Sequence, residues 1–213
     1  MIKNIKLVIF DLDGTLVDAY RAIIKSFNFT MQKLGYSAQD SLTIRRAVGW
    51  GDSNLLEPFV KSKDLKKALI LYRRHHKTAL VKYSRLLPGA EKVLHCLKGK
   101  GYKLAVASNR PTQFSWILIR SLGLRGYFDY VLCADKLKCG KPCPGILNKI
   151  TRRLIIKPTQ AVYVGDMAID AQAGRRAGIT TVIVTTGSST VMEARKEKPY
   201  RIISRIAELL NML

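Results

Sequence analysis

The sequence has few acidic residues and no long apolar run, and each shortage limits what the chain can be. Only 15 of its 213 residues are Asp or Glu, against 37 Lys and Arg, which gives a formal net charge of +22. No apolar stretch is long enough to span a membrane, and residues 1–4 lead into a predicted strand without room for a signal peptide. We therefore expect a cytoplasmic protein that does not insert into membranes.

Cysteines are also scarce, and they form no metal-binding pattern. The four are Cys96, Cys133, Cys139 and Cys143, and none belongs to a Cys-x-x-Cys pair. Cys139 and Cys143 are the closest two, but no neighbouring His completes a zinc site. Reduced thiols are the expected state.

The excess positive charge is spread along the chain. Short basic clusters, such as 61–67 and 149–153, fall in segments with helical spacing, where a solvated helix face accounts for them. A field of this sign attracts polyanions, so a basic, non-catalytic nucleic-acid-binding protein is one alternative. The same charge also suits an enzyme whose substrates are small phosphate anions, and we expect no specific nucleic-acid partner.

The apolar pattern over most of the chain predicts a doubly wound, Rossmann-like α/β fold. Strands are predicted at 5–10, 102–107, 130–133, 161–164 and 180–184, and helices at 90–100, 112–122, 144–154 and 168–177. Strands separated by helices of this length imply right-handed crossovers and a parallel sheet covered on both faces. A short strand and a closing helix are expected within 200–213.

Residues 18–85 have a different pattern, with helical spacing only. Apolar residues recur at this spacing in 22–34 and again in 65–80. Between these two helices lies a Gly-x-Gly turn around Trp50, followed by Asp52 or Ser53 as a possible helix cap. We therefore predict a small α-helical cap domain at 18–85, inserted into an α/β core formed by 1–17 and 86–213.

Carboxylates follow two of the predicted strands. Asp11 and Asp13 come directly after the first strand, and like charges held this close require a cation or a proton. Asp166 follows the strand at 161–164, and Asp170 lies one helical turn later on the same side. Because ligands of such sheets bind beyond the carboxyl ends of the strands, we expect the four carboxylates to converge. An all-oxygen site of this kind favours magnesium.

Two weaker signals accompany the carboxylates. Ser108 and Asn109 follow the strand at 102–107, where a hydroxyl and backbone N–H groups can hold a phosphate oxygen, although Ser-Asn is also an ordinary turn. Lys141 precedes Pro142, and a fixed ammonium can balance an aspartate and a transferring phosphoryl group. In so basic a chain, one more solvated lysine is the alternative interpretation.

Taken together, the segments at Asp11, Ser108, Lys141 and Asp166 resemble, in order, the four motifs of the haloacid dehalogenase superfamily of phosphotransferases. The resemblance covers essentially the whole chain. A helical cap after the first motif is similar to the phosphoglycolate phosphatase and β-phosphoglucomutase branch, and Val-Gly-Trp-Gly at 48–51 looks most like the phosphoglycolate phosphatases. The chain departs from the pattern at Arg110, where Lys is common.

This resemblance implies a magnesium-dependent phosphomonoester hydrolase that acts through an aspartyl-phosphate intermediate. It implies that Asp11 is the nucleophile and that Asp13 is the general acid and base. Magnesium would contact Asp11, the backbone carbonyl of Asp13 and Asp166, with Asp170 as a further ligand or the neighbour of one. The resemblance also implies that Lys141 is a catalytic cation that binds phosphate. Thr15, Ser108 and Asn109 would bind phosphate as well, and Gly49 and Trp50 of the cap would contact the substrate.

The substrate implied is a small phosphorylated metabolite, with 2-phosphoglycolate as the single best choice. A phosphosugar mutase of the β-phosphoglucomutase type has the same core motifs, so it is the second alternative. Either a monomer or a dimer agrees with the sequence.

Overall fold

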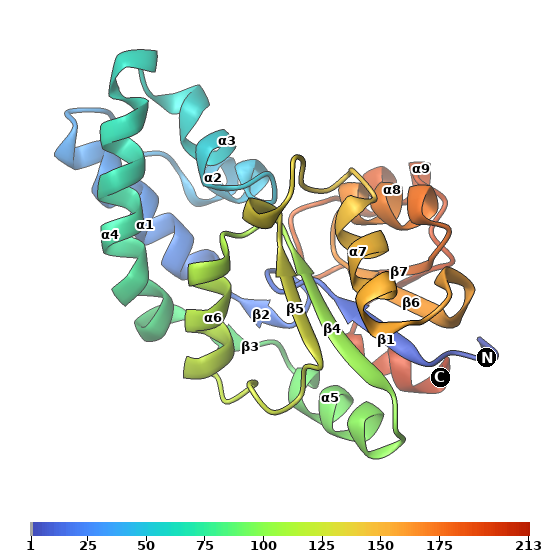
Figure 1. Cartoon of the computed structure of the whole chain (residues 1–213). Helices are drawn as coiled ribbons and strands as arrows, with labels where there is room; N and C mark the ends of the chain where they lie inside the picture. Colours follow the sequence, from blue (N-terminus) through green and yellow to red (C-terminus); the bar gives the residue numbers. More distant parts are fainter. Residues whose placement is uncertain (1) are drawn as a thin grey trace.

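The computed structural model describes residues 2–213. Its largest element is a six-stranded sheet with the order β5-β4-β1-β6-β7-β8, in which every neighbouring pair is parallel (Figure 1). The strands are β1 (Leu7–Phe10), β4 (Lys103–Ser108), β5 (Tyr130–Cys133), β6 (Ala161–Gly165), β7 (Thr180–Val184) and β8 (Arg201–Ile203). The predicted doubly wound α/β fold is confirmed.

Strand β1 lies in the middle of the sheet because it is apolar on both faces. All four of its residues are buried, and they alternate between two cores. Val8 and Phe10 belong to the larger core, whereas Leu7 and Ile9 belong to the core on the opposite face. A strand with this pattern can occupy only a central position, and its carboxyl end therefore lies at the middle of the sheet edge.

Helices cover both faces of the sheet, as predicted. They are α5 (Ala90–Gly99), α6 (Thr112–Ser121), α7 (Gly145–Leu154), α8 (Ala168–Ala177) and α9 (Val191–Lys196). Apolar residues of α7 and α8 pack with Leu7 and Ile9, and those of α5 and α6 belong to the core on the other face. The sequence pattern missed α9, and the closing helix is a 3₁₀ segment, Ile206–Asn211.

The segment between β2 (Val17–Asp18) and β3 (Arg85–Leu86) contains helices only, as the sequence predicted. It comprises α1 (Tyr20–Lys33), α2 (Ser41–Ala47), α3 (Asp52–Leu56) and α4 (Leu65–Tyr83), with short 3₁₀ turns before α4. Strands β2 and β3 pair antiparallel where this segment leaves and rejoins the rest of the chain. Figure 1 shows α1 and α4 side by side, away from the sheet, and α2 and α3 nearer to it.

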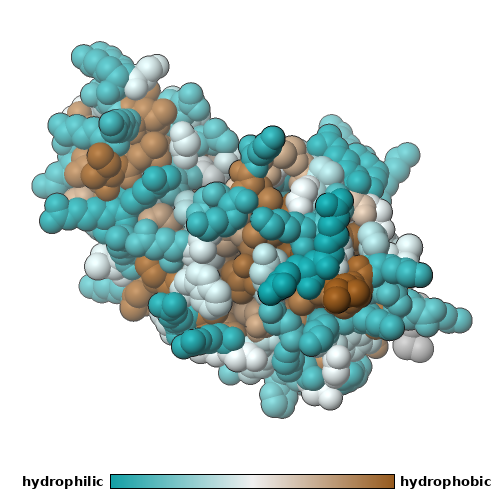
Figure 2. All heavy atoms as spheres, in the orientation of Figure 1, coloured by the Kyte–Doolittle hydropathy of each residue, from teal (hydrophilic) through white to brown (hydrophobic). Residues whose placement is uncertain are grey.

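The molecular surface agrees with the composition. Figure 2 shows hydrophilic side chains over most of the face that it displays, with small separate hydrophobic areas between them. No helix within residues 2–213 is both long and apolar enough to cross a membrane.

Candidate active site

A cleft lies where the helical segment meets the carboxyl edge of the sheet. It encloses about 500 Å³ of empty space, its mouth included, and is lined from the sheet side by Asp11, Asp13 and Ser108, among others. Asp11 directly follows β1, and Ser108 is the last residue of β4. From the helical segment, Tyr20 and Tyr72 also line the cleft. The parallel topology therefore brings the segments singled out in the sequence to one place.

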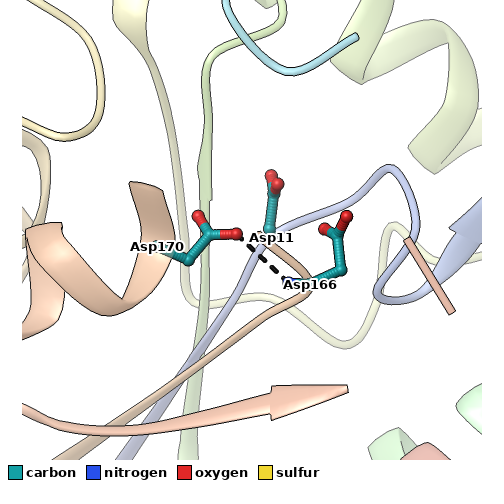
Figure 3. Close-up of side chains that lie close together, drawn as sticks. All are labelled: Asp11, Asp166 and Asp170. Atoms are coloured by element: carbon teal, nitrogen blue, oxygen red, sulfur yellow. Dashed lines mark hydrogen bonds between the residues drawn. The ribbon is translucent and has the colours of Figure 1, made fainter. Parts of the chain in front are cut away.

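Three carboxylates form a buried acidic cluster at the base of this cleft. Asp11, Asp166 and Asp170 each contribute an oxygen, and these oxygens lie within 4.8 Å of one another (Figure 3). Burial raises the pKa of Asp11 to about 6, although the nearby Lys141 opposes this shift. Burial, followed by the charges of Asp170 and Asp11, also raises the pKa of Asp166 well above its usual value. Repulsion of this kind favours a bound cation.

One carboxylate oxygen of Asp11 lacks a hydrogen-bond partner within residues 2–213, which agrees with a cation site at this position. Asp11 Oδ1 is buried and has no hydrogen-bond partner among the described residues. A buried polar atom without a partner is rare in folded proteins, and an ion is one common explanation. A set of hard carboxylate oxygens, with no His or Cys, suits magnesium better than zinc or copper.

A buried ammonium lies behind the cluster. Lys141 Nζ is 2.9 Å from Asp11 Oδ2 and 2.8 Å from Asp170 Oδ1, and it also donates to the Tyr163 hydroxyl at 3.0 Å. Burial alone would lower the pKa of Lys141, but the two carboxylates outweigh it and raise this pKa above its usual value. Lys141 is therefore charged, and the alternative of a solvated surface lysine is wrong.

Asp170 positions other groups and has little capacity left for a metal. Its Oδ2 accepts the backbone N–H groups of Asp166 (3.1 Å) and Met167 (3.0 Å). Its Oδ1 accepts from Lys141 and from the Tyr163 hydroxyl, the latter at 2.6 Å. These contacts favour the role of a neighbour of the metal ligands over that of a ligand. Tyr163 was missed in the sequence because a tyrosine in an apolar strand has the pattern of a core residue.

Thr15 also supports a carboxylate. Its hydroxyl donates to Asp166 Oδ1 at 3.1 Å, and the side chain is fully buried and does not line the cleft. The remaining oxygen, Asp166 Oδ2, accepts the Ser188 N–H at 3.3 Å. The β1 loop thus turns the Thr15 hydroxyl toward a carboxylate of the acidic cluster, and its contact with phosphate stays a prediction.

The carboxylate of Asp13 lies apart from the acidic cluster. Both of its oxygens accept from Arg110, with Nε to Oδ2 and Nη2 to Oδ1 each at 2.8 Å. The expected convergence of four carboxylates is thus limited to three, because the guanidinium draws the fourth to another wall of the cleft. The backbone carbonyl of Asp13 as a metal ligand stays a prediction.

Ser108 and Asn109 have different surroundings. Ser108 is buried, lines the cleft and accepts the Arg110 N–H at 3.2 Å. The Asn109 side chain accepts the Lys141 N–H at 2.7 Å and donates to the carbonyls of Lys141 (3.0 Å) and Gly49 (2.9 Å). The Asn109 side chain therefore fixes the Lys141 backbone and connects it to the helical segment.

Gly49 and Trp50, the two site residues predicted in the cap, differ in their position relative to the cleft. Gly49 lines the cleft with φ +113°, and a Cβ at this position would run into the side chain of Met167. Trp50 does not line the cleft, and 46% of its surface is exposed. The glycines on both sides bring the backbone against the sheet edge, so the side chain between them faces solvent in this structure, and a contact between Trp50 and the substrate stays a prediction.

Comparisons with known proteins agree with this geometry. Residues 8–184 match the family model described as haloacid dehalogenase-like hydrolase. The phosphoglycolate phosphatase of Aquifex aeolicus (strain VF5) is 31% identical, over 98% of this chain and 96% of that protein. The phosphoglycolate phosphatase of Nitrosospira multiformis is 33% identical, over 86% and 84%.

A similar fold occurs among solved structures. The crystal structure of a predicted phosphoglycolate phosphatase from Haemophilus somnus 129PT superposes with a TM-score of 0.95 and 25% identity, and the match covers 100% of this chain and 99% of that one. A hydrolase of the haloacid dehalogenase-like family from Streptococcus pneumoniae gives a TM-score of 0.90 at 24% identity, which speaks for the fold alone.

Proposed function

The chain belongs to the haloacid dehalogenase-like hydrolases and is a phosphatase, and we propose that it hydrolyses 2-phosphoglycolate in a magnesium-dependent reaction. The observation that carries this proposal is the state of Asp11 at the base of the cleft. Lys141 holds one of its oxygens at 2.9 Å, while the other is buried without a partner. Such a carboxylate is oriented, desolvated and free to react.

The proposed reaction has two steps with Asp11 as nucleophile. In the first, a carboxylate oxygen of Asp11 bonds to phosphorus, the ester P–O bond breaks, and the leaving alkoxide takes a proton from Asp13. In the second, water attacks the aspartyl-phosphate and gives a proton to Asp13, so that inorganic phosphate leaves and both aspartates return to their starting states. Proton transfer by a positioned carboxyl group contributes roughly 10²–10⁴ in rate.

Several side chains support these steps. Lys141 and Ser108 lie where they can contact the phosphoryl oxygens, and Asn109 fixes the Lys141 backbone. Magnesium would be held by the carboxylates of Asp11 and Asp166 and by the carbonyl of residue 13. When bound, it would neutralise charge on the phosphoryl group and reduce its repulsion from the nucleophile.

The domain division belongs to the same proposal. We assign 1–17 and 86–213 to the α/β core and 18–85 to a cap that closes over the cleft; residue 1 lies outside the described residues. The curated relatives named as phosphoglycolate phosphatases support the choice of substrate. A cytoplasmic location is also part of the proposal, supported by four free cysteines within residues 2–213.

Phosphate release over a panel of esters tests the proposed function. With magnesium, 2-phosphoglycolate should give the highest kcat/KM, at least about tenfold above nucleoside monophosphates. EDTA should abolish activity and magnesium should restore it, whereas calcium should restore little because its coordination is larger and looser. Full activity after dialysis against EDTA would exclude the metal assignment, and conversion of a sugar 1-phosphate to its 6-phosphate would identify a mutase instead.

A further inference from the structure

Arg110 is the cationic side chain that lines the cleft, within the described residues. Four carboxylates line the same cleft, those of Asp11, Asp13, Asp52 and Asp166. The guanidinium is nearly inaccessible, with 6% of its side chain exposed. Asp52 has a separate partner, because Arg73 Nε donates to it at 3.1 Å. Arg110 is therefore the group in this wall of the cleft that can receive an anion from a ligand.

The helical segment holds Arg110 independently of Asp13. Arg110 Nη1 lies 2.7 Å from Nε2 of His76, a fully buried residue of α4. A guanidinium only donates, so His76 Nε2 must accept and Nδ1 must carry the proton. That proton points to Ser26 Oγ at 3.1 Å, and the Ser26 hydroxyl in turn donates to the Ala22 carbonyl at 2.8 Å. The guanidinium would thus stay in the cleft if Asp13 moved away.

The present pairing blocks the acid and base role of Asp13. Both carboxylate oxygens accept from the same guanidinium, which holds Asp13 against this wall of the cleft. Asp13 must leave Arg110 before it can give the alkoxide a proton, which it regains from the attacking water in the hydrolysis step. A buried guanidinium left without an anion is strongly unfavourable, so the exchange requires another anion in place of Asp13.

We propose that Arg110 selects substrates with a second anionic group on the leaving-group side, in the simplest case a carboxylate, and that this anion displaces Asp13 and so frees it for proton transfer. The proposal rests on the proposed phosphatase function at Asp11. The planar fork of Arg110 matches a carboxylate with two parallel hydrogen bonds, which a lysine at this position would not reproduce. Binding of the correct substrate by Arg110 and release of Asp13 for proton transfer then occur in the same step.

The first test uses the unaltered protein with two substrates of matched size. One is 2-phosphoglycolate, and the other is its amide, which has a neutral group in place of the carboxylate. We expect kcat/KM to be about 10²-fold lower for the amide, because it cannot replace Asp13 on the guanidinium. A ratio near one, with clear turnover of both esters, would overturn the proposal while the phosphatase function stood. Absence of phosphate release from every ester would overturn both.

The second test changes Arg110. In Arg110→Gln, the preference for 2-phosphoglycolate over the amide should fall to within about threefold, chiefly because kcat/KM for 2-phosphoglycolate decreases. Arg110→Lys, which keeps the charge without the fork, should retain part of the preference. Arg120→Gln is the matched control: it removes one exposed arginine of α6 and should leave the ratio unchanged.

The ratio of kcat/KM for 2-phosphoglycolate to that for its amide distinguishes substrate selection by Arg110 from a purely structural role. If Arg110→Gln lowered kcat/KM equally for both esters, Arg110 would serve only to hold the fold or Asp13, and the proposal would be wrong. Thermal melting of each variant shows whether it is folded. Should Arg110→Gln not fold, Arg110→Lys and the substrate ratio of the unaltered protein decide the question by themselves.

Discussion

Replacement of Lys141 by methionine would remove the buried ammonium between Asp11 and Asp170. The side chain of Lys141 is 1% exposed, and its nitrogen lies within 3.0 Å of both carboxylates and the Tyr163 hydroxyl. Methionine has a similar volume, so the change removes charge and hydrogen bonds rather than packing. Removing one partner of a buried ion pair destabilises proteins by about 3–5 kcal/mol. We expect a loss of this size in Lys141→Met at pH 8 without metal.

The loss should depend on pH in a definite direction. In the wild type, the pKa of Asp11 is raised from 3.8 to about 6. Protonation of Asp11 therefore stabilises the folded state fully below pH 3.8, and this stabilisation is lost as the pH rises through about 6. Without Lys141 the folded-state pKa of Asp11 rises further, and this loss continues above pH 6. At pH 5 Asp11 carries a proton in both proteins, whereas above pH 6 only the variant keeps it. The loss of stability in the variant should therefore be smaller at pH 5 than at pH 8, by about 1.4 kcal/mol for each unit by which the pKa of Asp11 rises above its wild-type value, up to the limit set by pH 8.

Urea denaturation in EDTA at pH 5 and pH 8 measures both quantities. The matched control is Lys98→Met, since Lys98 pairs with Asp129 at 2.9 Å but its side chain is 40% exposed. Exposed pairs contribute about 0–1 kcal/mol, so the control should change little at either pH. A Lys141→Met protein that lost less than about 1 kcal/mol, equally at both pH values, would refute the ion-pair reasoning.

Two further predictions concern the chemistry and the closure of the cleft. Asp11→Asn should abolish turnover of every ester without trapped phosphoenzyme, whereas Asp13→Asn should give a burst of p-nitrophenolate near one equivalent in rapid mixing, because this leaving group hardly needs a proton. If Asp13→Asn hydrolysed p-nitrophenyl and alkyl phosphates equally slowly, and no phosphorylated Asp11 could be trapped, the acid and base role of Asp13 would be contradicted. Gly49→Ala should lower kcat/KM at least about tenfold through collision with Met167, and added Met167→Ala should restore part of it. Gly35→Ala is its control, because φ there is also positive but the added Cβ would meet no other part of the described chain within 4 Å. Unchanged activity in Gly49→Ala would show that the helical segment does not need its close approach to Met167.

The fold could be predicted largely from the chain itself, because its signals are local. The alternation of apolar strands and helices indicated the parallel sheet, and most of the predicted bounds lie within one or two residues of those observed. The weakest predictions were the shortest elements: α9 has six residues and lacks a periodic pattern long enough to detect. Strands of two residues, such as β2, likewise form only because the chain ends of the helical segment meet.

Parts of the site could also be predicted. Asp11 and Asp166 come directly after buried strands, so topology alone brings them to one edge of the sheet. The burial of Lys141 could not be inferred in the same way, since a lysine in a basic chain carries no sign of burial. Its contact with Tyr163 joins residues 22 positions apart on different elements.

The sequence by itself therefore determined the sheet, the helical insertion and the edge at which the carboxylates meet. Only the tertiary structure decided which of the carboxylates cluster together and which one pairs with Arg110 instead. Asp13 is separated from Arg110 by 97 positions, and Arg110 from His76 by 34, so these contacts exist only after the helical segment has packed against the sheet. The periodicity of an element depends on its own residues, whereas the partner of a buried charge depends on every element that surrounds it.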